Sequence, residues 1–262
     1  MKVALVQMTS VPDIQKNINH ITESIVRAKS KKADIVLFPE NCGYMGPGKM
    51  MKAHATSEKN HLVLKKAKDY AKKYSISVLL GSIAVLKTKH EKSKMVNRSY
   101  FINHMGEIIG KYDKIHMFDA MVSKKEVYRE SDSYFAGERI VNVESNLGNF
   151  GLSICYDIRF PELYSKLVKR GANIITIPSA FTVDTGKAHW EVLLRSRAIE
   201  TSCWVLAPAQ IGNHYGKRNT WGHSMIIDPW GRVLKEANNY TGIIYANIDV
   251  SLSQKIRSTW RS

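Results

Sequence analysis

Cysteine is scarce in this chain, and long hydrophobic runs are missing. Its three cysteines, Cys42, Cys155 and Cys203, form an odd count without paired spacing, which excludes a disulfide-rich scaffold and indicates reduced thiols. No stretch approaches the roughly 18 to 20 apolar residues of a membrane span. The apolar segment at residues 3–8 is too short for a signal peptide. We therefore expect a cytoplasmic protein that does not enter a membrane.

Linker-like composition is absent as well. No Pro-, Gly- or Ser-rich stretch marks a boundary, and we expect a single domain over residues 1–262. A chain of this length buries roughly three-quarters of its unfolded surface, so its stability requires neither disulfides nor a metal. The histidines do not have the spacing of metal ligands, and we expect no metal and no cofactor.

Acidic residues are few relative to basic ones. The chain has 39 Lys and Arg against 23 Asp and Glu, a formal net charge of +16. A basic surface of that size can bind nucleic acid nonspecifically. The lysines are scattered over residues 29–32, 65–73, 87–94 and 124–125, however, without interleaved aromatics for base stacking. We expect no nucleic-acid partner, and interpret the charge as serving solubility and attraction of a small anionic substrate.

Strand and helix patterns alternate along the chain. Residues 3–8 predict a strand, Asp13 caps a helix, and residues 34–38 predict a second strand. Further helices are expected near residues 57–74, 156–170 and 189–202, and further strands near 76–80, 95–102, 108–112, 140–143, 150–154, 172–178, 204–207, 225–234 and 243–247. Residues 41–50 and 114–137 are expected to form loops. The pattern predicts an α/β protein with two mixed sheets packed together and helices outside.

Cys155 ends an apolar run at residues 150–154 and precedes a helical pattern. A strand that delivers a thiol to a helix N-terminus holds it rigidly, and the helix dipole there favours the thiolate. A buried core cysteine explains the same pattern equally well.

Two more segments favour the nucleophile. Residues 35–38 are an unbroken apolar run that ends at Pro39 and Glu40, and residues 108–119 pass from apolar residues into charged ones around Lys114. Glu40, Lys114 and Cys155 together supply a base, an electrostatic clamp and a nucleophile.

At these residues the chain resembles the nitrilase, or carbon–nitrogen hydrolase, superfamily. The matching motifs are Phe-Pro-Glu40, Tyr-Asp-Lys114-Ile-His and Ile-Cys155-Tyr-Asp-Ile-Arg-Phe-Pro-Glu, in the order of the family. A further glutamate of the family corresponds to Glu130. The resemblance implies a four-layer α-β-β-α sandwich that commonly pairs as a homodimer.

Within the superfamily, four segments are similar to the branch that hydrolyses deaminated glutathione, namely residues 178–181, 185–191, 197–201 and 222–231. The omega-amidase branch, which acts on α-ketoglutaramate-like ω-amides, shares much of this pattern. The resemblance thus implies an amidase for a small anionic substrate, with a cysteine thioester intermediate.

This chemistry gives each residue an expected role. Glu40 would take the proton of Cys155 and return it to the leaving group, while Lys114 and the backbone N–H of Tyr156 hold the oxyanion. Glu130 would keep Lys114 charged, or form a plain structural ion pair. Phe181 and Thr182 are expected to line the substrate pocket, and Arg159 to support the turn after the cysteine.

Three other hypotheses remain. A cysteine–histidine pair with His189 or His223 is the main mechanistic rival. A basic nucleic-acid-binding protein and a catalytically silent partner-binding member of the fold are the other two. The intact set of Glu40, Lys114 and Cys155 argues against a silent member.

Overall fold

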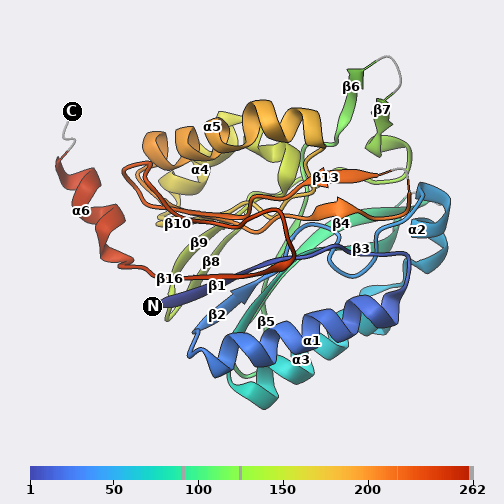
Figure 1. Ribbon diagram of the computed structural model, residues 1–262, viewed down its shortest axis with the longest axis horizontal. Helices are drawn as coiled ribbons and strands as arrows, with labels where there is room; N and C mark the ends of the chain where they lie inside the picture. Colours follow the sequence, from blue (N-terminus) through green and yellow to red (C-terminus); the bar gives the residue numbers. More distant parts are fainter. Residues whose placement is uncertain (90–91, 124–125, 217, 260–262) are drawn as a thin grey trace.

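The computed structural model describes residues 1–89, 92–123, 126–216 and 218–259. Two six-stranded sheets pack face to face, and helices cover the outer face of each sheet (Figure 1). Helices α1 (Ile14–Ser30) and α3 (Leu62–Tyr74) lie on one side, and α4 (Pro161–Lys169) and α5 (Val183–Thr201) lie on the other. The predicted four-layer α-β-β-α sandwich with two mixed sheets is therefore confirmed.

The first sheet has the strand order β16-β1-β2-β3-β4-β5. Its parallel centre is followed outward by antiparallel strands. The strands are β1 (Lys2–Gln7), β2 (Ile35–Leu37), β3 (Ser77–Lys89), β4 (Lys92–Ile102), β5 (Ile108–Asp113) and β16 (Gly242–Asn247).

The second sheet repeats this plan with the order β15-β14-β11-β10-β9-β8. Its strands are β8 (Asn142–Ser145), β9 (Gly148–Leu152), β10 (Ile174–Thr176), β11 (Trp204–Ala207), β14 (Met225–Ile227) and β15 (Val233–Glu236). Strands β2 and β10 are each the middle of a parallel trio. Residues 33–39 (Ala-Asp-Ile-Val-Leu-Phe-Pro) and 172–178 (Ala-Asn-Ile-Ile-Thr-Ile-Pro) have similar sequences, and they occupy equivalent places in the two sheets.

Apolar packing holds the four layers together. Leu5, Leu37 and Phe101 of the first sheet share one core cluster with Phe150 and Ile175 of the second. Full burial of each such side chain contributes roughly 1.5–3 kcal/mol.

Helix α1 covers the outer face of the first sheet. Its Ile18, Ile21 and Ile25 belong to the cluster beneath the helix, and Asp13 accepts a hydrogen bond from the backbone N–H of Lys16 at 3.0 Å. The predicted capped helix is thus confirmed.

The segment after Cys155 differs from the prediction. A short 3₁₀ turn, Cys155–Arg159, comes first, and α4 begins only at Pro161. Proline has no N–H to donate and is favoured in the first turn of a helix, so it fixes the start there. The cysteine therefore does not lie at the N-terminus of an α-helix.

Other irregular regions contain more structure than expected. The expected loop at residues 114–137 contains the hairpin β6 (Asp119–Ser123) and β7 (Glu126–Arg129) and the 3₁₀ turn Glu130–Asp132, and the loop at residues 41–50 runs into α2 (Gly48–His54). The helix expected from residue 57 begins only at Leu62, after a separate 3₁₀ turn at Glu58–Asn60. Also not predicted are β12 (Ile211–Asn213), β13 (Asn219–Trp221) and α6 (Ser251–Thr259). These elements are short, so their periodicity gives little signal.

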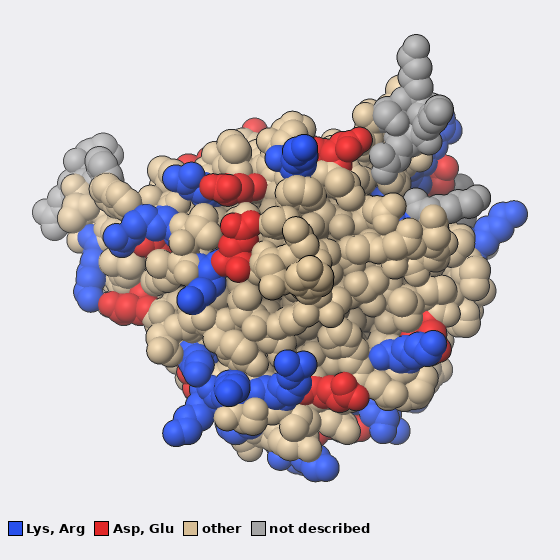
Figure 2. Space-filling model, in the orientation of Figure 1, with Lys and Arg blue, Asp and Glu red and all other residues tan. Residues whose placement is uncertain are grey.

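Basic side chains gather along the edge formed by α1 and α3, with acidic ones among them (Figure 2). Two of the lysine positions singled out in the sequence, 124 and 125, lie outside the described residues. In the parts of the chain that the structure describes, no helix is both long and apolar enough to cross a membrane.

A bulge in β3 supports the strand end that carries Glu40. The pairing of β3 with β4 shifts between Leu80 and Ile83. At Gly81, between them, an added Cβ would lie 1.9 Å from the carbonyl oxygen of Phe38 and 2.6 Å from the carbonyl carbon of Pro39. Only glycine permits this close approach of two backbone segments.

We expect Gly81→Ala to destabilise the fold by about 2 kcal/mol or more, since backbone atoms must move to admit the methyl group. Urea unfolding followed by circular dichroism measures this. Gly242→Ala is the matched control, because nothing lies within 4 Å of its added Cβ, and it should change stability by less than about 0.5 kcal/mol. Equal stability of the two variants would contradict the close approach.

Candidate active site

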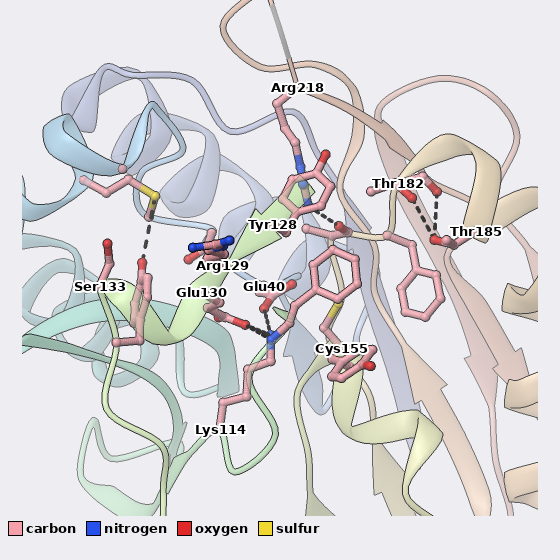
Figure 3. A pocket seen from close by; sticks show the side chains of 18 of the residues that line it. Glu40, Lys114, Tyr128, Arg129, Glu130, Ser133, Cys155, Thr182, Thr185 and Arg218 are labelled. Carbon is pink, nitrogen blue, oxygen red and sulfur yellow. Dashed lines mark hydrogen bonds and ion pairs between the residues drawn. The ribbon is translucent and has the colours of Figure 1, made fainter. Parts of the chain in front are cut away.

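Four of the side chains singled out in the sequence meet in one cavity. Glu40 follows β2, Lys114 follows β5 and Cys155 follows β9, while Glu130 begins the 3₁₀ turn after β7. All four line a cavity of about 210 Å³. Figure 3 shows the Lys114 side chain directed at Glu40 and Glu130, with Cys155 beside them.

Lys114 is the centre of a buried ion cluster. Its Nζ donates to Glu40 Oε1 at 3.0 Å and to Glu130 Oε2 at 2.8 Å, and the Lys114 side chain is 2% exposed. Burial lowers the pKa of Lys114, but the charges of Glu130 and Glu40 outweigh it and raise the pKa well above its usual value. The ammonium therefore stays charged. Two of its three N–H donors point at these carboxylates, which leaves the third for a ligand.

Asn97 ties the two carboxylates together, a role that the sequence did not suggest. Its Nδ2 donates to Glu40 Oε1 at 2.9 Å and to Glu130 Oε1 at 3.2 Å. The backbone N–H of Phe118 also donates to Glu130, at 2.7 Å. The only sequence signal is an amide within an expected strand, which is also common at structural positions.

The Cys155 sulfur is buried against Glu40. Burial raises the pKa of the Cys155 thiol, and the nearby charge of Glu40 raises it further. The prediction that a helix dipole would stabilise the thiolate is therefore wrong. The group rests as a thiol, and attack requires that a base remove its proton.

Backbone conformation also sets Cys155 apart. Its φ of 49° lies in the left-handed region, where few residues other than glycine occur. Its N–H donates to the carbonyl of Pro178 at 3.0 Å, which fixes the turn to the end of β10. The sulfur is thus held where a strand end and a strained turn meet.

Asp157 locks this turn to the segment that carries Lys114. Its Oδ2 accepts from the backbone N–H of Ile154 at 2.8 Å and from the Tyr112 hydroxyl at 2.7 Å. Its Oδ1 accepts from the backbone N–H of His116 at 3.0 Å. One fully buried carboxylate therefore positions the elements on both sides of the reacting group.

The predicted pocket residues Tyr156, Phe181 and Thr182 all line the cavity. Arg159, expected only to support the turn, lines it too. Its guanidinium lies 5.8 Å from the Tyr156 ring centroid and 5.7 Å from that of Phe181. Cavity residues that the sequence did not indicate are Asn41, Met51, Tyr128, Arg129, Ser133, Tyr134 and Arg218.

Histidine is not among the cavity-lining residues in the described ranges. His189 contacts Arg159 through Nδ1 at 3.2 Å, and His223 contacts Glu236. This arrangement gives no support to a cysteine–histidine pair. In the same ranges, no group of three or more His, Cys, Asp or Glu side chains is arranged to hold a metal ion.

Comparison with known proteins agrees with this geometry. The family model for carbon-nitrogen hydrolases matches residues 2–258. The deaminated glutathione amidase of Synechocystis is 39% identical, with 97% of this chain and 93% of that protein covered. The human deaminated glutathione amidase is 35% identical, with 97% and 79% covered.

Solved structures also match the chain over nearly its whole length. The chain matches the NitFhit protein of C. elegans with a TM-score of 0.90 and 37% identity, over 99% of this chain and 63% of that one. It matches Nit3 of Saccharomyces cerevisiae, a nitrilase-superfamily member, with a TM-score of 0.88 and 30% identity, over 99% and 94%. The chain belongs to the carbon–nitrogen hydrolase family.

Proposed function

We propose that this protein is a deaminated glutathione amidase, which cuts the amide bond between a ketoglutaryl unit and cysteinylglycine through a thioester on Cys155. The observation that carries the proposal is that the buried thiol of Cys155 shares one cavity with Glu40, a carboxylate that Lys114 holds in place. Relatives with this name from Synechocystis, Yersinia enterocolitica and human are 35–39% identical over nearly the whole chain.

In the first half of the reaction, Glu40 takes the proton of Cys155 as the sulfur attacks the amide carbon. The carbonyl oxygen becomes an oxyanion that accepts from the third N–H of Lys114 and from the backbone N–H of Tyr156. Each donor placed in this way contributes on the order of 10² to 10³ in rate. Glu40 then returns the proton to the departing nitrogen, and a thioester remains on Cys155.

In the second half, Glu40 accepts a proton from water as the water oxygen attacks the thioester carbon. Collapse of this second tetrahedral intermediate breaks the carbon–sulfur bond, and the proton returns to the Cys155 sulfur. Glu130 touches neither reacting atom in this scheme. It holds Lys114 in line with the oxyanion and balances its charge, supported by the contacts at 2.8 Å to Nζ and 2.7 Å to the Phe118 N–H.

We also propose that the chain acts as a single domain and a homodimer in the cytoplasm. One shared core between the two sheets supports a single folding unit. Val192 and Ile199 are exposed along α5, and exposed apolar side chains of this kind favour pairing. Cys42, Cys155 and Cys203 are free thiols, which fits a reducing compartment. The basic surface then serves an anionic substrate rather than nucleic acid.

The assignment of the base predicts a ranking of variants. Glu40→Gln keeps the shape of the side chain but removes the proton acceptor, so kcat should fall by roughly 10² to 10⁴. His189→Gln and His223→Gln, the matched controls, should change mainly stability. Steady-state kinetics with melting curves on all three proteins measure this. The opposite ranking would make the protein a cysteine–histidine enzyme.

The substrate assignment predicts that kcat/KM is higher for deaminated glutathione than for α-ketoglutaramate. It also predicts that kcat/KM falls as salt rises, because attraction of an anion by a basic protein is screened over roughly 8 to 10 Å. Release of ketoglutarate is the readout for both compounds, since cleavage of deaminated glutathione yields no ammonia. Faster cleavage of α-ketoglutaramate would make the protein an omega-amidase instead.

A further inference from the structure

Three arginines line the cavity, Arg129, Arg159 and Arg218. Within the described residues none of them forms an ion pair, whereas Arg98 and Arg197, outside the cavity, each pair with a carboxylate. Arg129 is exposed, whereas Arg159 and Arg218 are partly buried, and partial burial penalises an isolated charge. An anionic ligand in the cavity would supply the partner that Arg159 and Arg218 lack.

The net charge of the side chains that line the cavity also favours an anionic ligand. Among the described residues, Lys114 and the three arginines are the four basic side chains of the lining, and Glu40 and Glu130 are the two acidic ones, which gives a formal charge of +2. The two carboxylates already neutralise Lys114. The excess positive charge therefore belongs to the arginines, away from the ion cluster.

Arg218 lines the cavity beside Tyr128 (Figure 3). Its Nη2 donates to the carbonyl of Ala180 at 3.0 Å, and its guanidinium lies 4.4 Å from the centroid of the Tyr128 ring. Only one of its five N–H donors is used by the contact with Ala180. The planar group is thus oriented by a carbonyl and a ring, and its other N–H donors are available to a ligand in the cavity.

Arg159 approaches Phe181, the residue that follows Ala180. Its guanidinium lies 5.7 Å from the ring centroid of Phe181, and its Nη2 donates to His189 Nδ1 at 3.2 Å, so the His189 ring accepts there. Ala180 lines the same cavity as Cys155, and its backbone lies near enough to the Cys155 sulfur to lower the pKa of the thiol. Both guanidinium groups therefore contact the short segment that also touches the nucleophile, within reach of a small amide bound there.

We propose that Arg218, together with Arg159, forms a carboxylate-binding site that makes this enzyme select anionic amides. The proposal deepens the proposed function, because deaminated glutathione carries a carboxylate at each end, one on the acyl unit and one on the leaving dipeptide. Paired, charge-assisted hydrogen bonds from a planar guanidinium suit a carboxylate better than they suit a neutral amide.

Two matched substrate pairs test the site in the full-length protein. Glutaramate and glutaramide differ only in the charge at the acyl end. Deaminated glutathione and its glycine amide differ only in the charge at the leaving end. In Arg218→Gln, kcat/KM for the anionic member of at least one pair should fall roughly 10- to 100-fold, mainly through KM, with less than about a threefold change for its neutral partner. The affected pair identifies the carboxylate.

Two further variants separate recognition from folding and from overall charge. Arg218→Lys keeps the charge but not the planar donors, so its loss should be intermediate. Arg27→Gln removes the same charge from the exposed face of α1 and should leave both ratios unchanged. If Arg218→Gln lowers kcat/KM equally for charged and neutral members, or for neither, Arg218 only supports the Ala180 segment and the proposal is wrong.

A binding measurement tests the carboxylate site independently of the proposed reaction. Titration calorimetry with glutarate on Cys155→Ala, and on the same protein with Arg218→Gln added, should show affinity weaker by roughly 10-fold or more in the second. Equal affinities overturn the carboxylate site, even if the enzyme is an efficient amidase. Conversely, if the native enzyme does not cleave deaminated glutathione, the proposed function is wrong. The glutarate affinities still decide whether the carboxylate site exists.

Discussion

A buried ammonium shared by two carboxylates is the interaction on which the rest of the site depends. Lys114 contacts both Glu40 and Glu130, and Asn97 joins the same two side chains. Loss of one partner from a buried ion pair typically costs about 3–5 kcal/mol, because it leaves an uncompensated charge. Each member therefore requires the others, and strand ends far apart in the sequence must meet within hydrogen-bond distance.

This cluster explains how a thiol with a raised pKa can serve as a nucleophile. Burial and the charge of Glu40 both disfavour the Cys155 thiolate before substrate arrives. The same carboxylate is the group in contact with the thiol, so proton transfer and attack can occur together when an amide is bound. An enzyme of this kind keeps its cysteine less reactive toward oxidants than a resting thiolate would be.

The sequence predicts those parts of the site that follow strand ends. Glu40 and Cys155 could be found because apolar runs stop at them. The two-sheet fold could be found because its central strands β1, β2, β10 and β11 are nearly continuous apolar runs. Asn97 and Arg218 could not be found in this way, because their roles depend on contacts between distant parts of the chain. Asn97 contacts Glu40, 57 residues away, and Arg218 contacts Ala180, 38 residues away. The prediction of a helix directly after Cys155 was wrong, because Pro161 and the Asp157 hydrogen bonds favour a short turn before the helix.

The central claim is that Cys155 carries the acyl group during turnover. Native enzyme mixed with deaminated glutathione, quenched with acid within the first turnovers and digested, should show a ketoglutaryl thioester on the peptide that contains Cys155. The peptides that contain Cys42 and Cys203 should be unmodified. Turnover without an adduct on Cys155, or an adduct on either of the other two cysteines, would contradict the account.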